Sequence, residues 1–176
     1  MVGKEWMSYN VRKAVMEDVS AIANLHVNSW AVAYKGLMPE SYIARFSYER
    51  RHKLWTRMVG EQLAHVFVAS HDHDIVGFMC FDDLRGDDTG KIAKVSTLYV
   101  CPDFYRKGIG SLLLARCESE LVRLDYEKVV LSSLESNESA LRFYSSQGYQ
   151  ATGESNSEQL DDYILHEVEL AKALLS

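Results

Sequence analysis

One stretch of the chain, residues 98–115, constrains its folding more than any other part. It reads Leu98-Tyr-Val-Cys-Pro-Asp-Phe-Tyr-Arg-Lys-Gly-Ile-Gly-Ser-Leu-Leu-Leu-Ala115. An apolar, strand-like run ends at Pro102, a basic turn with two glycines follows, and an amphipathic helical pattern begins directly after it. This order predicts a strand, a tight turn and a helix whose unpaired N-terminal N–H groups lie at the turn. Such a helix start suits an anion, above all a diphosphate.

The residues of this turn strengthen the anion-binding interpretation. Gly108 and Gly110 carry no Cβ, so the main chain can come close to a ligand there. Arg106 and Lys107 add positive charge, the first as a planar fork and the second as a point charge. The spacing fits neither common nucleotide motif: a dinucleotide loop would have a third glycine where Leu113 stands, and a Gly-x4-Gly-Lys-Ser/Thr loop is absent. A plain strand-to-helix connection that contains two glycines is the remaining alternative.

Composition favours a globular protein of ordinary kind. The chain has 176 residues, 47% hydrophobic and 25% charged, so we expect a single domain over residues 1–176 with one sizeable core. The formal net charge of −6 argues against a nucleic-acid partner. Cys80, Cys101 and Cys117 form no CxxC pair and are interpreted as free thiols of a reducing compartment. No apolar stretch approaches the roughly 20 residues of a membrane span, and residues 1–9 lack a signal-peptide core, so we expect a cytoplasmic protein without membrane contact.

Apolar periodicity predicts a mixed α/β fold. Period-two and β-branched runs mark strands at residues 10–15, 65–70, 75–81, 92–100, 128–134, 149–153 and 163–170. Helical spacing or capping marks residues 18–34, a segment near 39–46, a helix capped by Ser47, and residues 108–124 and 139–146. We therefore expect one central, mostly antiparallel mixed sheet of about seven strands, flanked by about four helices.

A second segment carries a pattern of equal importance. It reads Leu131-Ser-Ser-Leu-Glu-Ser-Asn-Glu-Ser-Ala-Leu-Arg-Phe-Tyr-Ser-Ser-Gln-Gly-Tyr149 and places Asn137 at the exit of a strand, before the helix that carries Tyr144. Asn137 and Tyr144 are nearly two helical turns apart, so they can address one side of the helix. Together with the glycine turn, the segment resembles the GNAT superfamily of acetyl-CoA-dependent N-acyltransferases, whose later motif is Asn-x-x-Ala-x-x-Phe-Tyr-x-x-x-Gly-Phe/Tyr. The chain matches that motif at Asn137, Ala140, Phe143, Tyr144, Gly148 and Tyr149.

The resemblance covers about residues 9–170, including a segment at 26–42 that is similar to many bacterial members. It implies roles for particular residues. Backbone N–H groups of the turn would hold the pyrophosphate of acetyl-CoA; these residues are Arg106, Lys107, Gly108, Ile109, Gly110 and Ser111. Leu98, Tyr99 and Val100 would line the pantetheine, and a strand splay near Val100 would offer an N–H to the acetyl carbonyl. Asn137 would hydrogen-bond the pantetheine arm or the reacting region, and the Tyr144 phenol would protonate the departing thiolate.

Two positions depart from the family pattern. The family's coenzyme motif is Gln/Arg-x-x-Gly-x-Gly/Ala, and Tyr105 occupies its first position here. This departure should weaken a side-chain contact to the pyrophosphate and leave the contacts from main-chain N–H groups intact. Ser132 stands where members that acetylate ribosomal-protein N-termini often carry a glutamate, which argues against that identity. The general base is therefore unassigned. The sequence leaves Asp82, Asp83, Glu135 and water as alternatives.

The resemblance implies an N-acetyltransferase that moves the acetyl group of acetyl-CoA directly to a primary amine of a small molecule or peptide. A catalytically silent acyl-CoA-binding regulatory module, or an α/β domain for another nucleotide, are the alternatives. The acceptor stays open among polyamines, amino acids, antibiotics, peptide N-termini and lysine side chains, and a homodimer is possible. We expect no metal, because the turn at 71–74 is explained by its exposure. Four aromatic residues should pack the helical layer or line an acceptor pocket: Trp30, Tyr34, Tyr42 and Trp55.

Overall fold

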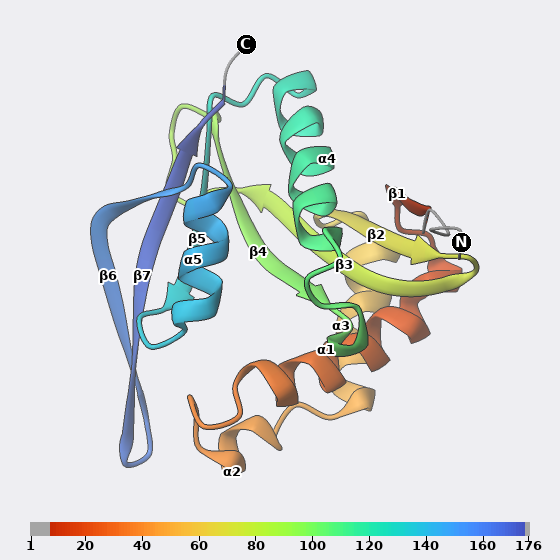
Figure 1. Ribbon diagram of the computed structural model, residues 1–176. Helices are drawn as coiled ribbons and strands as arrows, with labels where there is room; N and C mark the ends of the chain where they lie inside the picture. The colour runs from red at the N-terminus through yellow and green to blue at the C-terminus, as the bar shows by residue number, and fades with distance from the viewer. Residues whose placement is uncertain (1–7, 175–176) are drawn as a thin grey trace, which may run out of the picture.

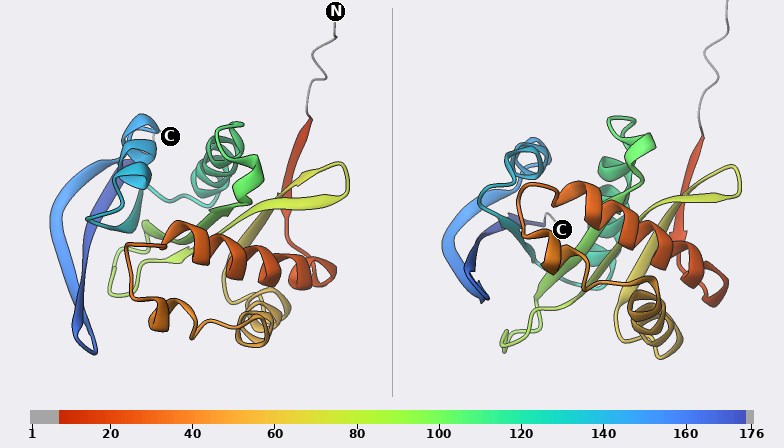
Figure 2. Two further views of the ribbon diagram at one scale, coloured as in Figure 1. Left: turned by 60° about the horizontal axis from the view of Figure 1, so that its bottom comes forward. Right: turned by 90° about the horizontal axis from the view of Figure 1, so that it is seen from below.

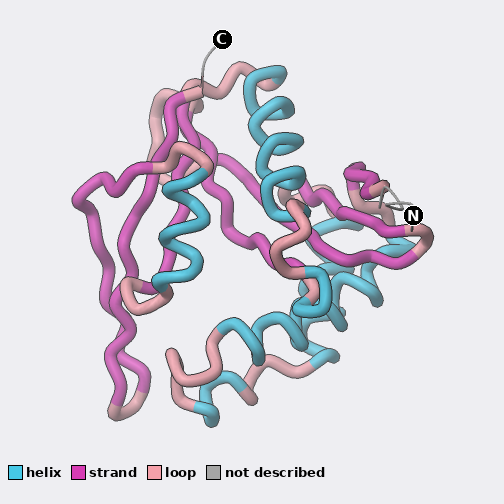
Figure 3. Tube along the Cα trace, in the orientation of Figure 1, coloured by secondary structure: helices cyan, strands magenta, loops and turns pink. Residues whose placement is uncertain are grey.

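Seven strands form one mixed sheet in the computed structural model of the chain, which describes residues 8–174 (Figures 1 and 3). The strands are β1 (Tyr9–Lys13), β2 (His65–His71), β3 (Asp74–Asp83), β4 (Ile92–Val100), β5 (Lys128–Leu134), β6 (Gln150–Leu160) and β7 (Tyr163–Ala173). They lie in the order β1-β2-β3-β4-β5-β7-β6, and only β4 and β5 pair in parallel. The predicted sheet is confirmed. Most of the start of the chain, for which we expect no signal peptide, lies outside the described residues.

The described residues form five α-helices: α1 (Val19–Ala33), α2 (Glu40–Ile43), α3 (Tyr48–Gly60), α4 (Ile109–Arg123) and α5 (Glu138–Ser146). Four were predicted close to these bounds, and Ser47 caps α3 as expected, since its Oγ accepts from the N–H of Arg50 at 3.4 Å. The segment near 39–46 is helical for a single turn only, because Ser47 is already extended, with ψ 163°, to begin α3. None of the described helices is long and apolar enough to cross a bilayer.

The helices cover both faces of the sheet (Figure 2). Helices α1 and α3 pack on one face, where Ile22 and Trp55 meet Val68 of β2. Helix α4 packs on the other face, where Leu113 meets Phe67, and α5 lies on that same side. Successive side chains of a strand point to opposite faces, so burial on both sides explains why β2 is apolar without alternation. The two helical layers thus meet the centre of the sheet from opposite sides.

The parallel pair β4 and β5 separates halfway along its length. Pairing runs from Ile92 opposite Lys128 to Val95 opposite Leu131 and then stops, while β5 continues to pair with β7. A register shift against β3 leaves Ser96 without a paired residue at this point. The predicted splay is present, but it begins after Val95 and not near Val100. A bulge re-aims a strand, which accounts for the earlier departure.

Strand β6 is longer than the sequence indicates. We predict a strand at 149–153, whereas pairing with β7 resumes after an irregularity and runs to Leu160 opposite Tyr163. This edge strand is exposed at every residue but Leu160, so its polar sequence shows no buried alternation. The tip of the β6–β7 hairpin contacts the loop after α1, where Tyr163 Oη donates to the carbonyl of Leu37 at 3.2 Å. The hairpin tip is thereby tied to the loop after α1.

Candidate active site

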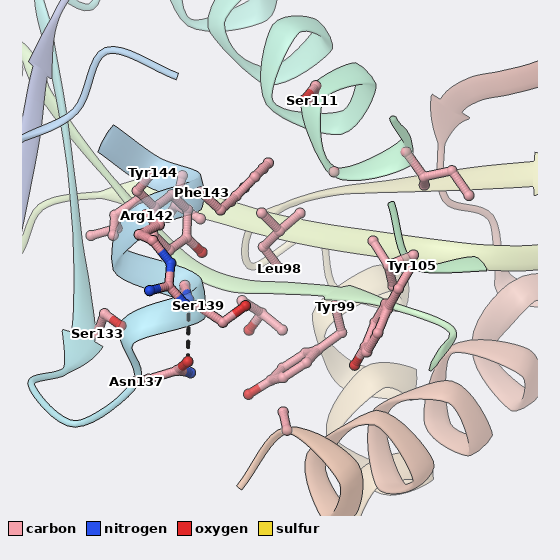
Figure 4. Close-up of a pocket in the computed structure, with 18 of the residues that line it drawn as sticks. Leu98, Tyr99, Tyr105, Ser111, Ser133, Asn137, Ser139, Arg142, Phe143 and Tyr144 are labelled. Carbon is pink, nitrogen blue, oxygen red and sulfur yellow. Dashed lines mark hydrogen bonds between the residues drawn. The ribbon is translucent and has the colours of Figure 1, made fainter. Parts of the chain in front are cut away.

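A cleft of about 700 Å³ opens where β4 and β5 separate (Figure 4). Its walls come from β4, the loop before α4, the first turn of α4, the end of β5, helix α5 and the end of α1. All but one of the residues that the resemblance implies line this cleft: Leu98, Tyr99, Val100, Arg106, Gly108, Ile109, Gly110, Ser111, Asn137 and Tyr144. Residues 98–111 and 137–144, separated by 25 residues of chain (112–136), are thus brought to one space.

The N-terminus of α4 faces this cleft without a side-chain cap among the described residues. Gly108 takes the N-cap position with φ +83°, a left-handed conformation that glycine adopts without strain. Arg106 is also left-handed, with φ +59°, so the loop turns sharply twice within three residues. The N–H groups of the first helical turn therefore stay available, together with the positive end of the helix dipole. This geometry suits a diphosphate, as the sequence predicts.

Gly110 has a packing reason of its own. A Cβ built on Gly110 would lie 3.0 Å from Cζ of Phe143, so the absence of a side chain lets α5 approach α4. The second glycine of the turn therefore sets the distance between the two helices that flank the cleft. The sequence assigns it to close approach of an anion, and the structure adds this second requirement.

Lys107 is the one predicted contact that lies outside the cleft. Its Nζ donates to the carbonyl of Asp103 at 3.0 Å and lies 4.5 Å from the ring centroid of Phe104. Tyr105, in the Gln/Arg position, does line the cleft and is 44% exposed. Burial of part of its ring raises the pKa of Tyr105, which keeps the phenol protonated. A neutral donor thus stands where the family pattern has an amide or a cation.

The free edge of β4 presents main-chain groups to the cleft. The N–H of Cys101 donates to the carbonyl of Val76 at 2.8 Å, toward β3. Because the two edges of a strand alternate in an antiparallel ladder, the N–H and C=O of Val100 face the opposite edge. The hydroxyl of Ser29 in α1 donates to that carbonyl at 3.2 Å, which leaves the N–H of Val100 as a donor toward the splay.

Three tyrosines meet at the inner end of the cleft. The hydroxyls of Tyr34 and Tyr99 lie 3.2 Å apart, and all three phenols, with Tyr144, line the cleft. Burial raises the pKa of each, and the neighbouring Tyr34 raises that of Tyr144 further. No described group hydrogen-bonds the Tyr144 hydroxyl. The cleft thus holds a protonated phenol free to donate.

Asn137 has a local role as well as a place in the cleft. It is the N-cap of α5, and its Oδ1 accepts from the N–H of Ala140 at 3.2 Å (Figure 4). The side-chain NH₂ group is not used by this contact and remains a donor. The asparagine therefore begins the helix that carries Tyr144 and offers one hydrogen bond of its own.

The candidate bases lie away from the cleft. Asp82 and Asp83 pair with Lys94 and Ala93 at the far end of β4, and Asp83 Oδ1 accepts from Tyr126 Oη at 2.5 Å. Glu135 is exposed beyond the end of β5 and does not line the cleft either. Ser132, the other position in question, does line it. Among the alternatives for the general base, this arrangement favours water.

Sequence reasoning missed two charged residues near this region. Glu167 of β7 lies close enough to raise the pKa of Tyr34, and Arg51 of α3 lowers the pKa of His26. Neither belongs to a local motif, because folding alone brings β7 and α3 to this place. Among the described residues no group of His, Cys, Asp and Glu side chains could hold a metal ion.

The aromatic residues divide between two cavities. Tyr34 lines the cleft, while Trp30 and Trp55 line a smaller cavity of about 260 Å³ on the face of α1 and α3. Tyr42 lines neither; its ring centroid lies 5.4 Å from that of Phe46, beside the β6–β7 hairpin. Of the four aromatic residues expected to pack the helical layer or to line a pocket, Tyr42 thus only packs, while Trp30, Tyr34 and Trp55 line a cavity.

Comparison with known proteins places the fold and the sequence in one group. The chain is 28% identical to the uncharacterized N-acetyltransferase YuaI of Bacillus subtilis over 149 residues, 84% of each chain. It is 25% identical to a spermidine N(1)-acetyltransferase of Thermoplasma acidophilum over 157 residues, 86% of this chain and 94% of that one. The crystal structure of the PaiA N-acetyltransferase of that organism, in complex with coenzyme A, superposes with a TM-score of 0.74 at 22% identity, covering 95% and 99% of the two chains.

A structure of YncA from Salmonella typhimurium with acetyl-CoA has the same fold, with a TM-score of 0.74 at 19% identity, over 96% of this chain and 95% of that one. The sequence model of the acetyltransferase (GNAT) family matches residues 25–149, the stretch from α1 through both motifs to the end of α5. That match spans most of the chain and includes the open start of α4 and the Asn137–Tyr144 segment. It confirms the predicted family and the acyltransferase class, and the chain belongs to the acetyltransferase (GNAT) family.

Proposed function

We propose that the protein is an N-acetyltransferase that moves the acetyl group of acetyl-CoA directly to a primary amine. One observation carries this proposal: a single cleft joins an open helix start, suited to a diphosphate, with a protonated and unpartnered phenol. The main-chain groups of β4 lie between these two ends. The related structures with coenzyme A and acetyl-CoA support the same ligand for this fold.

The first part of the mechanism is binding and orientation. The N–H groups at Gly108–Ser111 hold the diphosphate, and Leu98 and the side-chain NH₂ of Asn137 contact the pantetheine. The N–H of Val100 donates to the thioester carbonyl, whose oxygen gains negative charge when the amine attacks. Positioning converts a bimolecular step into one that is nearly intramolecular, which supplies much of the rate.

The second part is proton transfer. The amine must be neutral to attack, and water carries away the proton that it loses, because no described carboxylate lines the cleft. As the C–N bond forms and the C–S bond breaks, Tyr144 gives its proton to the departing sulfur, and the phenolate then takes a proton back from water. The raised pKa of Tyr144 keeps that proton available at neutral pH.

The test is the Tyr144→Phe variant, assayed by release of the CoA thiol with a panel of amines. We expect kcat to fall about 100-fold or more, while the Kd for acetyl-CoA changes by less than about 3-fold. Tyr48→Phe is the matched control, because Tyr48 begins α3 and does not line the cleft. Unchanged turnover in Tyr144→Phe would remove the tyrosine from the mechanism.

The same panel separates the alternative function. A silent regulatory module would bind acetyl-CoA and raise the melting temperature without turnover on any amine. A domain for another nucleotide would be stabilised by ATP or NAD and not by acetyl-CoA.

A further inference from the structure

The smaller cavity adjoins the cleft on the face of the sheet that α1 and α3 cover. It lies between α1, α3 and β4, and residues Ser96, Thr97 and Tyr99 of β4 line both spaces. The two spaces therefore meet where β4 leaves β5. A molecule in the smaller cavity can present a group to the reacting end of the cleft through this junction.

Arg51 places an unpaired cation in this cavity. Its guanidinium carbon lies 4.2 Å from the ring centroid of Phe46 and 5.2 Å from that of Trp30. Its Nε is buried without a hydrogen-bond partner, and among the described residues no carboxylate forms an ion pair with it. A buried arginine is normally paired, because desolvating its donors without acceptors is costly. The stacked rings hold the guanidinium in place and leave its donors for a ligand.

Two further donors share the cavity. Nε1 of Trp30 is buried and has no hydrogen-bond partner. Nδ1 of His26 accepts from Nε1 of Trp55 at 3.0 Å, so the neutral ring carries its proton on Nε2, for which the described residues offer no acceptor. Burial lowers the pKa of His26 to about 3, which keeps the ring neutral, and the hydrogen bond from Trp55 fixes the tautomer.

The cavity lacks acidic groups altogether among its described lining residues. Ser96, Thr97 and Tyr99, which also line it, carry hydroxyls that can accept as well as donate, and the other walls include the apolar Leu54 and Met58. Because the guanidinium has no carboxylate partner here, the cavity favours a ligand that brings its own negative charge. A polyamine would instead place an ammonium group beside Arg51 with no carboxylate to receive it.

On the basis of the acetyl transfer proposed above, we infer that the acceptor is a free amino acid with an apolar side chain, whose carboxylate binds Arg51. Nε1 of Trp30 and Nε2 of His26 donate to the same carboxylate region, and the aromatic walls contact the side chain. The volume of about 260 Å³ corresponds to about nine water molecules at roughly 30 Å³ each, enough for one such molecule. The α-amine then lies at the junction with the cleft.

Matched pairs of amines test this inference in the full-length enzyme. L-phenylalanine is compared with phenethylamine and L-leucine with 3-methylbutylamine, since each pair differs only by the carboxylate; spermidine is included as a polycation. We expect kcat/KM to be at least about 100-fold higher for each amino acid than for its decarboxylated partner, because the unpaired donors of the cavity penalise a ligand without an acceptor. Equal or better use of the decarboxylated amines, of spermidine, or of protein N-termini alone would overturn the inference and leave acetyl transfer standing.

Variants of Arg51 locate the source of the preference. Arg51→Met should lower kcat/KM for L-phenylalanine about 100-fold, with phenethylamine and the Kd for acetyl-CoA changed less than about 3-fold. Arg51→Lys should have a kcat/KM for L-phenylalanine between those of the wild type and Arg51→Met, since lysine keeps the charge and loses the planar fork. Arg57→Met is the control, because Arg57 is on the same helix, exposed, and paired with Glu61 at 3.5 Å.

The outcomes are distinguishable from failure of acetyl transfer itself. No turnover with any amine, together with no acetyl-CoA binding, refutes the proposed function. Turnover that is indifferent to Arg51→Met refutes only the assignment of the carboxylate. If Arg51→Met does not fold, Arg51→Lys and the wild-type preference between paired amines decide the question.

Discussion

The two sides of β4 offer ligands different parts of the chain. On the side of α4 and α5 the donors proposed for the diphosphate and the thioester are backbone groups: the N–H groups at Gly108–Ser111 and the N–H of Val100. On the side of α1 and α3 they are side chains: Arg51, Trp30 and His26. Backbone donors are the same whatever the residue, so the first side suits a constant ligand. Side-chain donors change with each substitution, so the second side suits the ligand that differs between relatives.

We call the side of α1 and α3, proposed to bind the acceptor, the acceptor side, and the side of α4 and α5 the coenzyme side. The acceptor side should lose more stability in acid than the coenzyme side. The pKa of His26 is lowered to about 3 in the folded state, against 6.5 unfolded, because burial disfavours the charged ring. Between these values the unfolded state binds more protons, so stability should fall as pH decreases from about 6.5 to about 3. The full loss from this group is on the order of 5 kcal/mol, from about 3.5 pKa units at about 1.4 kcal/mol each.

Urea unfolding at several pH values measures this dependence. His26→Phe cannot gain a proton, so its unfolding free energy should fall less steeply over the same range. His52→Phe is the control, because His52 lies on α3 outside both cavities, with Nε2 3.4 Å from Ser20 Oγ and its ring beside that of Tyr48. Equal pH profiles for the wild type and His26→Phe would show that the buried ring does not make this side acid-sensitive.

On the coenzyme side, stability should instead fall when side-chain volume is added between α4 and α5. Gly110→Ala places a Cβ 3.0 Å from Phe143 Cζ, and we expect it to cost about 2 kcal/mol in unfolding free energy through overpacking. Phe143→Leu removes the ring atom that would clash. In a double-mutant cycle the cost of Gly110→Ala should shrink to below about 1 kcal/mol in the Phe143→Leu background.

An additive cycle would contradict the packing role of Gly110. In that case the glycine would serve the ligand alone, and the distance between α4 and α5 would be set elsewhere. Acetyl-CoA affinity measured on the same four proteins separates the two effects.

The contrast between the two sides also explains what could be predicted from sequence. The coenzyme side is encoded in two continuous segments, because glycine and capping residues leave a local signature, and Gly108, Asn137 and Tyr144 were predicted to converge. The acceptor side combines α1, α3 and β4, which are separate in the chain, and no local pattern marks Arg51 as half-buried against Trp30, 21 residues before it. The charge run at residues 49–53 is typical of an exposed helix face, and packing against Phe46 and Trp30 distinguishes Arg51 from its neighbours.

The fold shows the same contrast between features encoded locally and features set by pairing with distant segments. Strands buried on both faces, such as β2, are apolar throughout and were predicted within a residue or two. The outer half of β6 was missed, because an exposed edge strand is held by backbone pairing with β7 and not by buried side chains. The start of the splay was misplaced for a similar reason, since the unpaired Ser96 arises from registers on both sides of β4.

The smallest expected effect tests whether the coenzyme side depends on bare backbone. Gly108 and Gly86 have nearly the same left-handed φ, +83° and +85°, and a Cβ on either would meet no atom within 4 Å. Alanine at each position should therefore cost about 1 kcal/mol of unfolding free energy through backbone strain alone.

Only Gly108→Ala should also weaken acetyl-CoA, by about 10-fold in Kd, because its methyl group would lie where the diphosphate approaches the start of α4. Titration calorimetry measures the Kd for acetyl-CoA, and urea unfolding measures the unfolding free energy, for both variants and the wild type. If the two variants lose the same stability and bind acetyl-CoA alike, the diphosphate does not approach the chain at Gly108. The glycine would then serve the turn alone, and side chains would have to bind the coenzyme as they are proposed to bind the acceptor.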